Sequence, residues 1–267
     1  MRPAHPATRL RAITVHLIAT TPTGRALLTP TPAGPPAPPG TELRHGEDPH
    51  HAAQRLLDEL PAPGRLTATH DIRTQLSHHP AGHLHTDRIL YTAALTAEAP
   101  TTADPATAAD LTRHHPHPDT LAHPRTGQRR FAAYGLVTDP DDRLLLTLIT
   151  DGYPGAGTWH LPGGGTDHGE DPRTALTREI TEETAQHGRV GALIGIHSRY
   201  RPESLHPGEA RTPWHGVWAF YRATVAHPGP VRVLDTGGST TDARWYHRDE
   251  LPGLDLSITT RQALALA

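Results

Sequence analysis

Two stretches of this chain carry the same series of motifs in the same order, one on each side of a proline-rich segment. Each series begins with an apolar run, a turn that contains Pro and a second apolar run, at residues 14–28 and 134–146. A Pro-Gly pair follows, then six residues, then Glu-Asp-Pro, and an Arg stands eight residues after that Glu. This ordered repetition predicts two copies of one fold, each starting as strand, turn and strand.

The segment between the two copies, residues 98–128, is rich in Pro, Ala, Thr and His. Pro removes a backbone donor and restricts the residue before it, so no long helix or strand is expected here, although residues 106–112 could form a turn or two of helix. We therefore predict a first domain at 1–97, a linker at 98–128 and a second domain at 129–267.

Composition excludes several classes of protein. The chain has no Cys, which excludes a disulfide scaffold and a thiolate metal site and suits a reducing compartment. A formal net charge of −3 gives no basic surface for nucleic acid. Neither a secretory leader nor an apolar run long enough for a membrane span is apparent. We expect a soluble cytoplasmic protein with no nucleic-acid or membrane partner.

Residues 172–187 have the signals of a helix that follows a Gly-rich loop. Asp171 is a favourable N-cap, and Pro172 suits the first helical position. Gly188 is expected to end the helix in a left-handed conformation. The apolar positions follow a helical spacing, at Ala175, Leu176 and Ile180.

The predicted helix carries an acidic face. Glu179, Glu182 and Glu183 are spaced i, i+3 and i+4, so their like charges repel across one face. A hard divalent cation such as Mg²⁺ would compensate, because it takes carboxylate oxygens as ligands. Arg178 is within i+4 reach of Glu182, and Glu170 can approach from the loop. Taken alone, such a Glu-rich run is more often a solvated helix face.

The segment from Gly164 to Glu183 resembles the Nudix box: Gly, five residues, Glu, seven residues, then Arg-Glu-aliphatic-any-Glu-Glu. The similarity extends to residues 158–164 before the box and 243–252 after it, and covers roughly residues 129–260. Residues 10–97 resemble a degenerate second copy. The family usually has Gly at the position of Ala185 and an aliphatic residue at that of Gln186. Since Ala costs little in a helix, the metal site is expected to persist.

This resemblance implies an α/β fold of tandem Nudix-like α/β/α sandwiches with mixed β-sheets. It also implies Mg²⁺-dependent hydrolysis of a diphosphate linkage, with Mn²⁺ as a substitute, in a nucleoside diphosphate joined to another group. The implied metal ligands are Glu179, Glu182, Glu183 and the backbone carbonyl of Gly164. The implied catalytic residues are Glu182, Glu179, Arg178, which orients a glutamate, and Glu170, which assists.

The first copy lacks this ligand set. When the copies are aligned on their Glu-to-Arg spacing, the three ligand positions become Leu56, Glu59 and Leu60. Leu cannot ligate Mg²⁺, so we expect this copy to be inactive. It would pack on the second domain, help to form a homodimer, or bind a ligand without cutting it.

Several residues outside the box are candidates for substrate binding. Arg199 and Arg201 could hold a phosphate and Trp214 could stack on a base, although a polar surface loop explains them equally well. The general base would be a box glutamate or a later one, Glu203 or Glu209. ADP-ribose, dinucleotide polyphosphates, nucleoside triphosphates and nucleotide sugars all remain possible substrates.

Two other functions compete with hydrolysis. One is a non-catalytic regulatory module that binds a nucleotide or nucleotide sugar, which the complete set of box carboxylates disfavours. The other is a Nudix-like isomerase of a prenyl diphosphate, which the absence of Cys disfavours.

Overall fold

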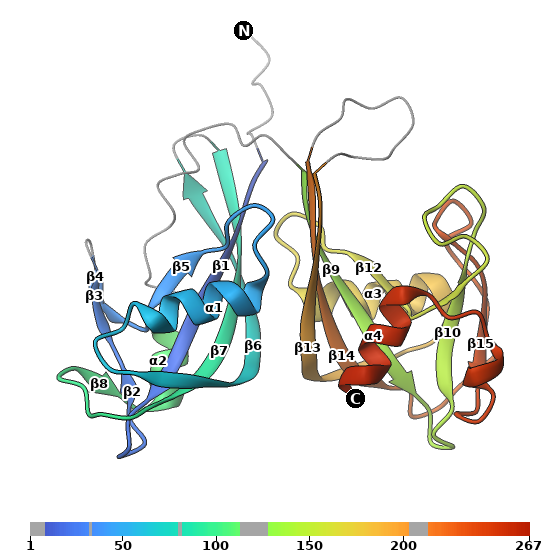
Figure 1. Cartoon of the computed structure of the whole chain (residues 1–267). Helices are drawn as coiled ribbons and strands as arrows, with labels where there is room; N and C mark the ends of the chain where they lie inside the picture. The colour runs from blue at the N-terminus through green and yellow to red at the C-terminus, as the bar shows by residue number, and fades with distance from the viewer. Residues whose placement is uncertain (1–8, 32–33, 80–81, 113–127, 203–212) are drawn as a thin grey trace, which may run out of the picture. The chain divides into compact units, whose positions relative to one another are not determined.

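This computed structural model describes residues 9–31, 34–79, 82–112, 128–202 and 213–267 and contains two large β-sheets (Figure 1). The chain divides into two compact units. The first comprises Met1–Arg129 and His197–Gly216, and the second comprises Arg130–Ile196 and Val217–Ala267. One boundary between the units falls between residues 129 and 130, and the first unit also takes in residues 197–216 from the later half of the chain.

The first unit contains a six-stranded sheet in the order β6-β7-β1-β2-β8, with β5 paired to β1. Strands β1 and β7 are parallel, whereas β6 and β7 are antiparallel, so the sheet is mixed. Its elements are β1 (Arg9–Thr20), β2 (Ala26–Leu27), β5 (Gly40–Glu42), α1 (Pro49–Asp58), β6 (Gly64–His79), β7 (Gly82–Leu95), β8 (Thr102–Ala103) and α2 (Pro105–Leu111). A two-stranded sheet accompanies it, formed by β3 (Thr29–Thr31) and β4 (Gly34–Ala37).

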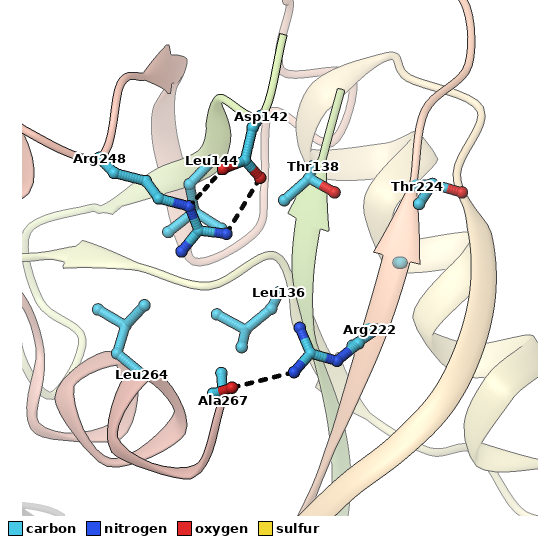
Figure 2. Close-up of a pocket in the computed structure, with 10 residues that line it drawn as sticks. Leu136, Thr138, Asp142, Leu144, Arg222, Thr224, Arg248, Leu264 and Ala267 are labelled. Atoms are coloured by element: carbon cyan, nitrogen blue, oxygen red, sulfur yellow. Dashed lines mark hydrogen bonds and ion pairs between the residues drawn. The ribbon is translucent and has the colours of Figure 1, made fainter. Parts of the chain in front are cut away.

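The second unit is built on a seven-stranded sheet in the order β11-β10-β9-β14-β13, with β12 on β9 and β15 on β10. Strands β9 and β10 are antiparallel, and β9 and β14 run the same way (Figure 2). The strands are β9 (Gln128–Thr138), β10 (Leu144–Ile149), β11 (Trp159–His160), β12 (Gly163–Gly165), β13 (Arg189–Arg201), β14 (Trp214–Thr224) and β15 (Thr240–Tyr246). The helices are α3 (Pro172–Thr184), the 3-10 turn η3 (Leu251–Gly253) and α4 (Ile258–Leu266).

Two helices cover opposite faces of the second sheet. Side chains alternate between the faces along a strand, so Leu136 of β9 lies on the face opposite Gly135. Leu136 belongs to a buried apolar cluster with Phe220 of β14 and Ala263 of α4. On the other face, a Cβ at Gly135 would lie 3.3 Å from Leu176 of α3. The second unit is thus a sandwich of helix, sheet and helix. Among the described helices, none combines the length and apolar content that crossing a bilayer requires.

The two sheets repeat one arrangement. The order β6-β7-β1-β2 in the first unit corresponds to β13-β14-β9-β10 in the second. In each unit a short strand pairs antiparallel with the central strand, β5 with β1 and β12 with β9. A helix with an Asp N-cap and Pro at its start then follows, α1 after Asp48 and α3 after Asp171. The motif series of the sequence therefore has a counterpart in strand order and in helix capping.

Part of the segment predicted as a linker belongs to the first unit. Strand β8 pairs with β2, and Ala108 and Ala109 of α2 are buried against Ile18 and Leu90. The composition of the segment did not predict this packing, because Ala occurs both in short buried helices and in loops. The remainder of the predicted linker, residues 113–127, lies outside the described residues.

The box helix ends earlier than the sequence predicted. α3 stops at Thr184, and Ala185 rather than Gly188 adopts the left-handed conformation, with φ of 55°. The Thr184 hydroxyl accepts a hydrogen bond from the backbone N–H of Gln186 at 3.3 Å, which offers the chain an alternative to a further helical turn. The expectation that Ala185 costs little inside a helix was therefore wrong, because this residue caps the helix.

We predict that Ala185→Gly stabilises the protein. A left-handed conformation costs a non-Gly residue about 1–2 kcal/mol, and the greater freedom of Gly in the unfolded chain offsets part of that gain. The expected net effect is about 0.5–1 kcal/mol, or a rise in melting temperature of roughly 2–3 °C by calorimetry. The control Ala175→Gly, inside α3, should lower the melting temperature. A decrease with Ala185→Gly would contradict this account of the cap.

Candidate active site

Arg178 is bonded to the loop before α3 and to the acidic face of α3. Its Nε and Nη2 donate to the two carboxylate oxygens of Glu170, each at 3.0 Å, which is a bidentate ion pair. Its Nη1 donates to Glu179 at 3.0 Å and to Glu182 at 2.9 Å, and its Nη2 also reaches the Gly165 carbonyl at 3.2 Å. The hydrogen bonds to Glu170 and the nearby negative charge of Glu179 raise the pKa of Arg178. The structure therefore brings together all four predicted catalytic residues.

The backbone of the Gly-rich loop lies directly against Glu179. A Cβ at Gly164 would stand 2.5 Å from a carboxylate oxygen of Glu179, closer than a real side chain tolerates. Gly163 has φ of +140°, and a Cβ there would collide with the backbone of β9. Gly163 thus allows β12 to pack on β9, and Gly164 allows the same strand to approach Glu179 of α3. Burial raises the pKa of Glu179, against the opposing effect of Arg178.

Glu183 points into the interior. Its side chain is buried, with 6% of the residue exposed, and it accepts hydrogen bonds from the Gly163 N–H at 2.9 Å and the Thr240 hydroxyl at 2.5 Å. Burial raises the pKa of Glu183 to about 7, although both hydrogen bonds favour the ionised form. Glu182, by contrast, has a side chain that is 42% exposed and bonded to Arg178.

A small cavity of about 30 Å³ lies between side chains of α3 and the loop before β15. Its volume suits a water molecule or a small ion. Glu179 and Glu183 line it from the helix, and Asp235 lines it from the loop. The other lining residues are Gly238, Ser239 and Thr240. Sequence reasoning missed Asp235, because Asp-Thr-Gly-Gly marks only a turn and no fixed spacing connects it to the box.

The donors around this cavity are of the kind that a hard cation takes, since they are carboxylate oxygens beside a glycine backbone. In the described part of the chain, no three acidic or histidine side chains converge closely enough to ligate one ion. Arg178 binds Glu179 and Glu182, and Glu183 is directed to Gly163 and Thr240. The donor set therefore fits Mg²⁺ in its chemistry, and the carboxylates would have to turn to it.

The residues predicted for substrate binding lie at the end of β13 and the start of β14, not on α3. Arg199, Arg201 and Trp214 belong to the segment that groups with the first unit. The guanidinium carbon of Arg201 lies 5.8 Å from the centre of a Trp214 ring, so these two are brought together. The two candidate later-loop bases, Glu203 and Glu209, lie outside the described residues.

The first unit repeats the ion pair without the acidic cluster. Arg55 forms a bidentate pair with Glu47 at 2.9 and 3.1 Å and reaches the Glu42 carbonyl at 3.4 Å. These bonds match those of Arg178 to Glu170 and Gly165. At the aligned ligand positions, however, Leu56 is buried, and the Glu59 side chain is 61% exposed and 3.8 Å from Arg55.

A larger cavity of about 230 Å³ opens where β9 and β14 end (Figure 2). At this cavity, Arg248 donates two hydrogen bonds to the Asp142 carboxylate, at 2.7 and 3.1 Å, and Arg222 donates to the Ala267 carbonyl at 3.1 Å. Leucines form its apolar floor, at Leu136, Leu144 and Leu264. None of the predicted site residues lines it, so we place the candidate active site at α3.

Comparison with known proteins gives a family match over the second unit. The family model described as NUDIX domain matches residues 128–266. Diphosphoinositol polyphosphate phosphohydrolase 2 of Rattus norvegicus is 35% identical over 78 residues, 29% of this chain and 42% of that protein. The putative 8-oxo-dGTP diphosphatase of Bacillus subtilis (strain 168) is 36% identical over 67 residues, 25% of this chain and 42% of that protein. The match thus spans less than half the length of these relatives.

Solved structures also resemble the chain. The MutT protein from Methanosarcina mazei Go1 has a TM-score of 0.42 at 18% identity, covering 53% of this chain and 94% of that one. The MutT NUDIX hydrolase from Burkholderia pseudomallei has a TM-score of 0.39 at 25% identity, covering 52% of this chain and 98% of that one.

We predict that Glu183 makes the metal-free protein less stable as pH rises. Its pKa is higher in the folded protein, about 7 against an ordinary value of 4.5, so the folded state binds the extra proton between these values. The free energy of unfolding should therefore fall across this window, by up to about 3 kcal/mol. Glu183→Gln removes this loss.

The measurement is the melting temperature of wild type and Glu183→Gln in EDTA at pH 5 and at pH 8. Relative to the wild type, the melting temperature of the variant should be higher at pH 8 than at pH 5. An unchanged difference between the two proteins would show that Glu183 does not titrate in this window.

Proposed function

This chain belongs to the Nudix family, and we propose that its second unit is a Mg²⁺-dependent hydrolase that cuts a diphosphate linkage in a nucleoside diphosphate joined to another group. One observation carries the proposal. The second unit presents the three glutamates proposed as metal ligands, Glu179, Glu182 and Glu183, on α3, and Arg178 already binds two of them together with Glu170. On a helix face that is merely solvated, Glu183 would be exposed and Glu179 would not need a glycine backbone beside it. Here Glu183 is buried, and Gly164 lies against Glu179.

We assign the cation to Glu179, Glu182, Glu183 and the Gly164 carbonyl, with Mn²⁺ as a substitute for Mg²⁺. When bound, the cation would neutralise diphosphate oxygens and position or acidify the attacking water. Like charges on Glu179 and Glu182 favour this assignment, because a divalent cation relieves the repulsion between them.

The chain's own residues then have separate tasks. Glu182 is the most exposed of the three box glutamates, and we propose that it meets the attacking water and takes its proton. Arg178 holds Glu182 and Glu179 in place by its planar fork, and Glu170 fixes the orientation of that fork. Gly164 keeps the loop backbone close to Glu179.

Substrate choice is supported only at the level of the linkage. The relatives are named for a diphosphoinositol polyphosphate and for 8-oxo-dGTP, and what these compounds share is a phosphoanhydride. The organic group attached to it differs between them. We therefore propose the phosphoanhydride as the reacting bond, in a small-molecule nucleotide derivative, and keep a panel of nucleotide substrates open.

We propose that the first unit is a degenerate Nudix-like copy that does not hydrolyse. Its strand order and its Arg55–Glu47 pair support common ancestry with the second unit. Leu56 is buried where the second unit has Glu179, which leaves no carboxylate to hold a cation there. Formation of a homodimer and a cytoplasmic location stay predictions.

The first test is turnover of a panel that contains ADP-ribose, a dinucleotide polyphosphate, nucleoside triphosphates and a nucleotide sugar. At least one member should release a phosphate product with Mg²⁺ and none with EDTA. Glu182→Gln should lower kcat by about 10²–10⁴-fold, the range for loss of a general base.

Glu59→Gln is a matched control, because it makes the same change at the aligned position of the first unit. It should leave turnover unchanged. A protein that converts no panel member, yet is stabilised by one of them, would contradict hydrolysis and favour the non-catalytic binding module.

A further inference from the structure

Residues 226–239 make up most of the loop between β14 and β15, and backbone hydrogen bonds fix them to the end of α3. The N–H groups of Leu234 and Asp235 donate to the Glu182 carbonyl at 2.8 and 3.0 Å, and the N–H of Arg232 donates to the Thr184 carbonyl at 3.1 Å. The last carbonyls of a helix have no partners within the helix. This loop supplies those partners, and it does so at the residues that carry the acidic face.

Gln186 holds the other end of the same loop. It is 2% exposed, and both the oxygen and the nitrogen of its side-chain amide form hydrogen bonds. Its Oε1 accepts from the Gly229 N–H at 2.9 Å, and its Nε2 reaches the carbonyls of Gly229 and Pro230, each at 3.3 Å. A buried amide that lost these partners would be costly. An aliphatic residue, which the Nudix pattern usually has at this position, would make none of these bonds.

The far end of the loop presents Asp235 to the small cavity that Glu179 and Glu183 also line. The turn that follows shapes this placement. The Gly237 N–H donates to Asp235 Oδ1 at 3.1 Å, and a Cβ at Gly238 would stand 2.5 Å from Asp235 Oδ2. Gly238 therefore lets the chain pass close to an acidic side chain that lines the same cavity as Glu179 and Glu183.

We propose that Gln186 is a positioning residue, which holds the loop of residues 226–239 so that Asp235 adds a carboxylate to the cation site of α3. The proposal rests on the proposed function. Asp235 supplies the charge, and Gln186 acts only through the loop. The substitution of Gln for the usual aliphatic residue is thus part of how this chain builds its site, rather than a loss of the motif.

The test compares Gln186→Leu, Asp235→Asn and the double variant with wild type. Each single change should weaken Mg²⁺ binding to the metal-free protein, measured by calorimetry, by about tenfold, and lower kcat by a similar factor with little change in KM. The double variant should be no worse than Asp235→Asn alone, because both changes act on one group. Gln186→Leu should also speed amide hydrogen exchange at Leu234 and Asp235.

Leu234→Ala is the matched control. The Leu234 side chain is 54% exposed in the same loop, and its removal keeps the backbone bond to Glu182. Mg²⁺ affinity and kcat should stay within about twofold of wild type. If Gln186→Leu failed to fold, Asp235→Asn, at an exposed position, would still decide whether that carboxylate contributes.

The outcomes separate the two proposals. A wild type that binds Mg²⁺ but converts no substrate would contradict the proposed function, and the Mg²⁺ affinities of the variants would still test Gln186 and Asp235. Turnover that is lost in Glu182→Gln but unchanged in Gln186→Leu and Asp235→Asn would overturn the inference alone. A double variant far worse than Asp235→Asn would show that Gln186 acts by another route.

Discussion

The bidentate ion pair between Arg178 and Glu170 is the contact on which the rest of the candidate active site depends. It joins the Gly-rich loop to α3, and the same guanidinium then reaches Glu179 and Glu182. Without the Arg178 guanidinium, the carboxylates of Glu179 and Glu182 would repel each other, and the loop would lose its ion pair to α3. The first unit has a matching pair, Arg55 with Glu47, and of the three aligned ligand positions only Glu59 is acidic. The pair therefore joins loop and helix in both units, and in the second unit Glu179, Glu182 and Glu183 accompany it.

The site has a second support at the end of α3. Ala185 turns the chain out of the helix in a left-handed conformation, and this frees the Glu182 and Thr184 carbonyls for the loop of residues 226–239. Strain at Ala185 and burial of Glu183 both cost stability in the metal-free protein. Such costs are typical of functional sites, where surrounding packing holds groups in unfavourable states.

Local signals in the sequence predicted local features of the structure. Asp171 and Pro172 start α3 as expected, and the spacing of Arg178 from Glu170 gives the observed ion pair. The helix end, the packing of α2 and the position of Asp235 could not be predicted. Each depends on contacts between residues far apart in the chain, such as the hydrogen bond between Glu182 and Leu234. No periodicity or motif in the sequence predicts such contacts. Gln186 could be recognised as a departure from the family pattern, but its hydrogen bonds required the structure.

The most direct test of the account is a crystal structure of the protein with bound Mn²⁺, located by anomalous scattering. The account predicts a peak beside α3, within ligand distance of carboxylates from Glu179, Glu182 and Glu183, with Asp235 at the same ion or at its bound water. Well-formed crystals with no peak at α3 at saturating Mn²⁺, or with the ion bound only elsewhere, would contradict the claim that this acidic face is a metal site.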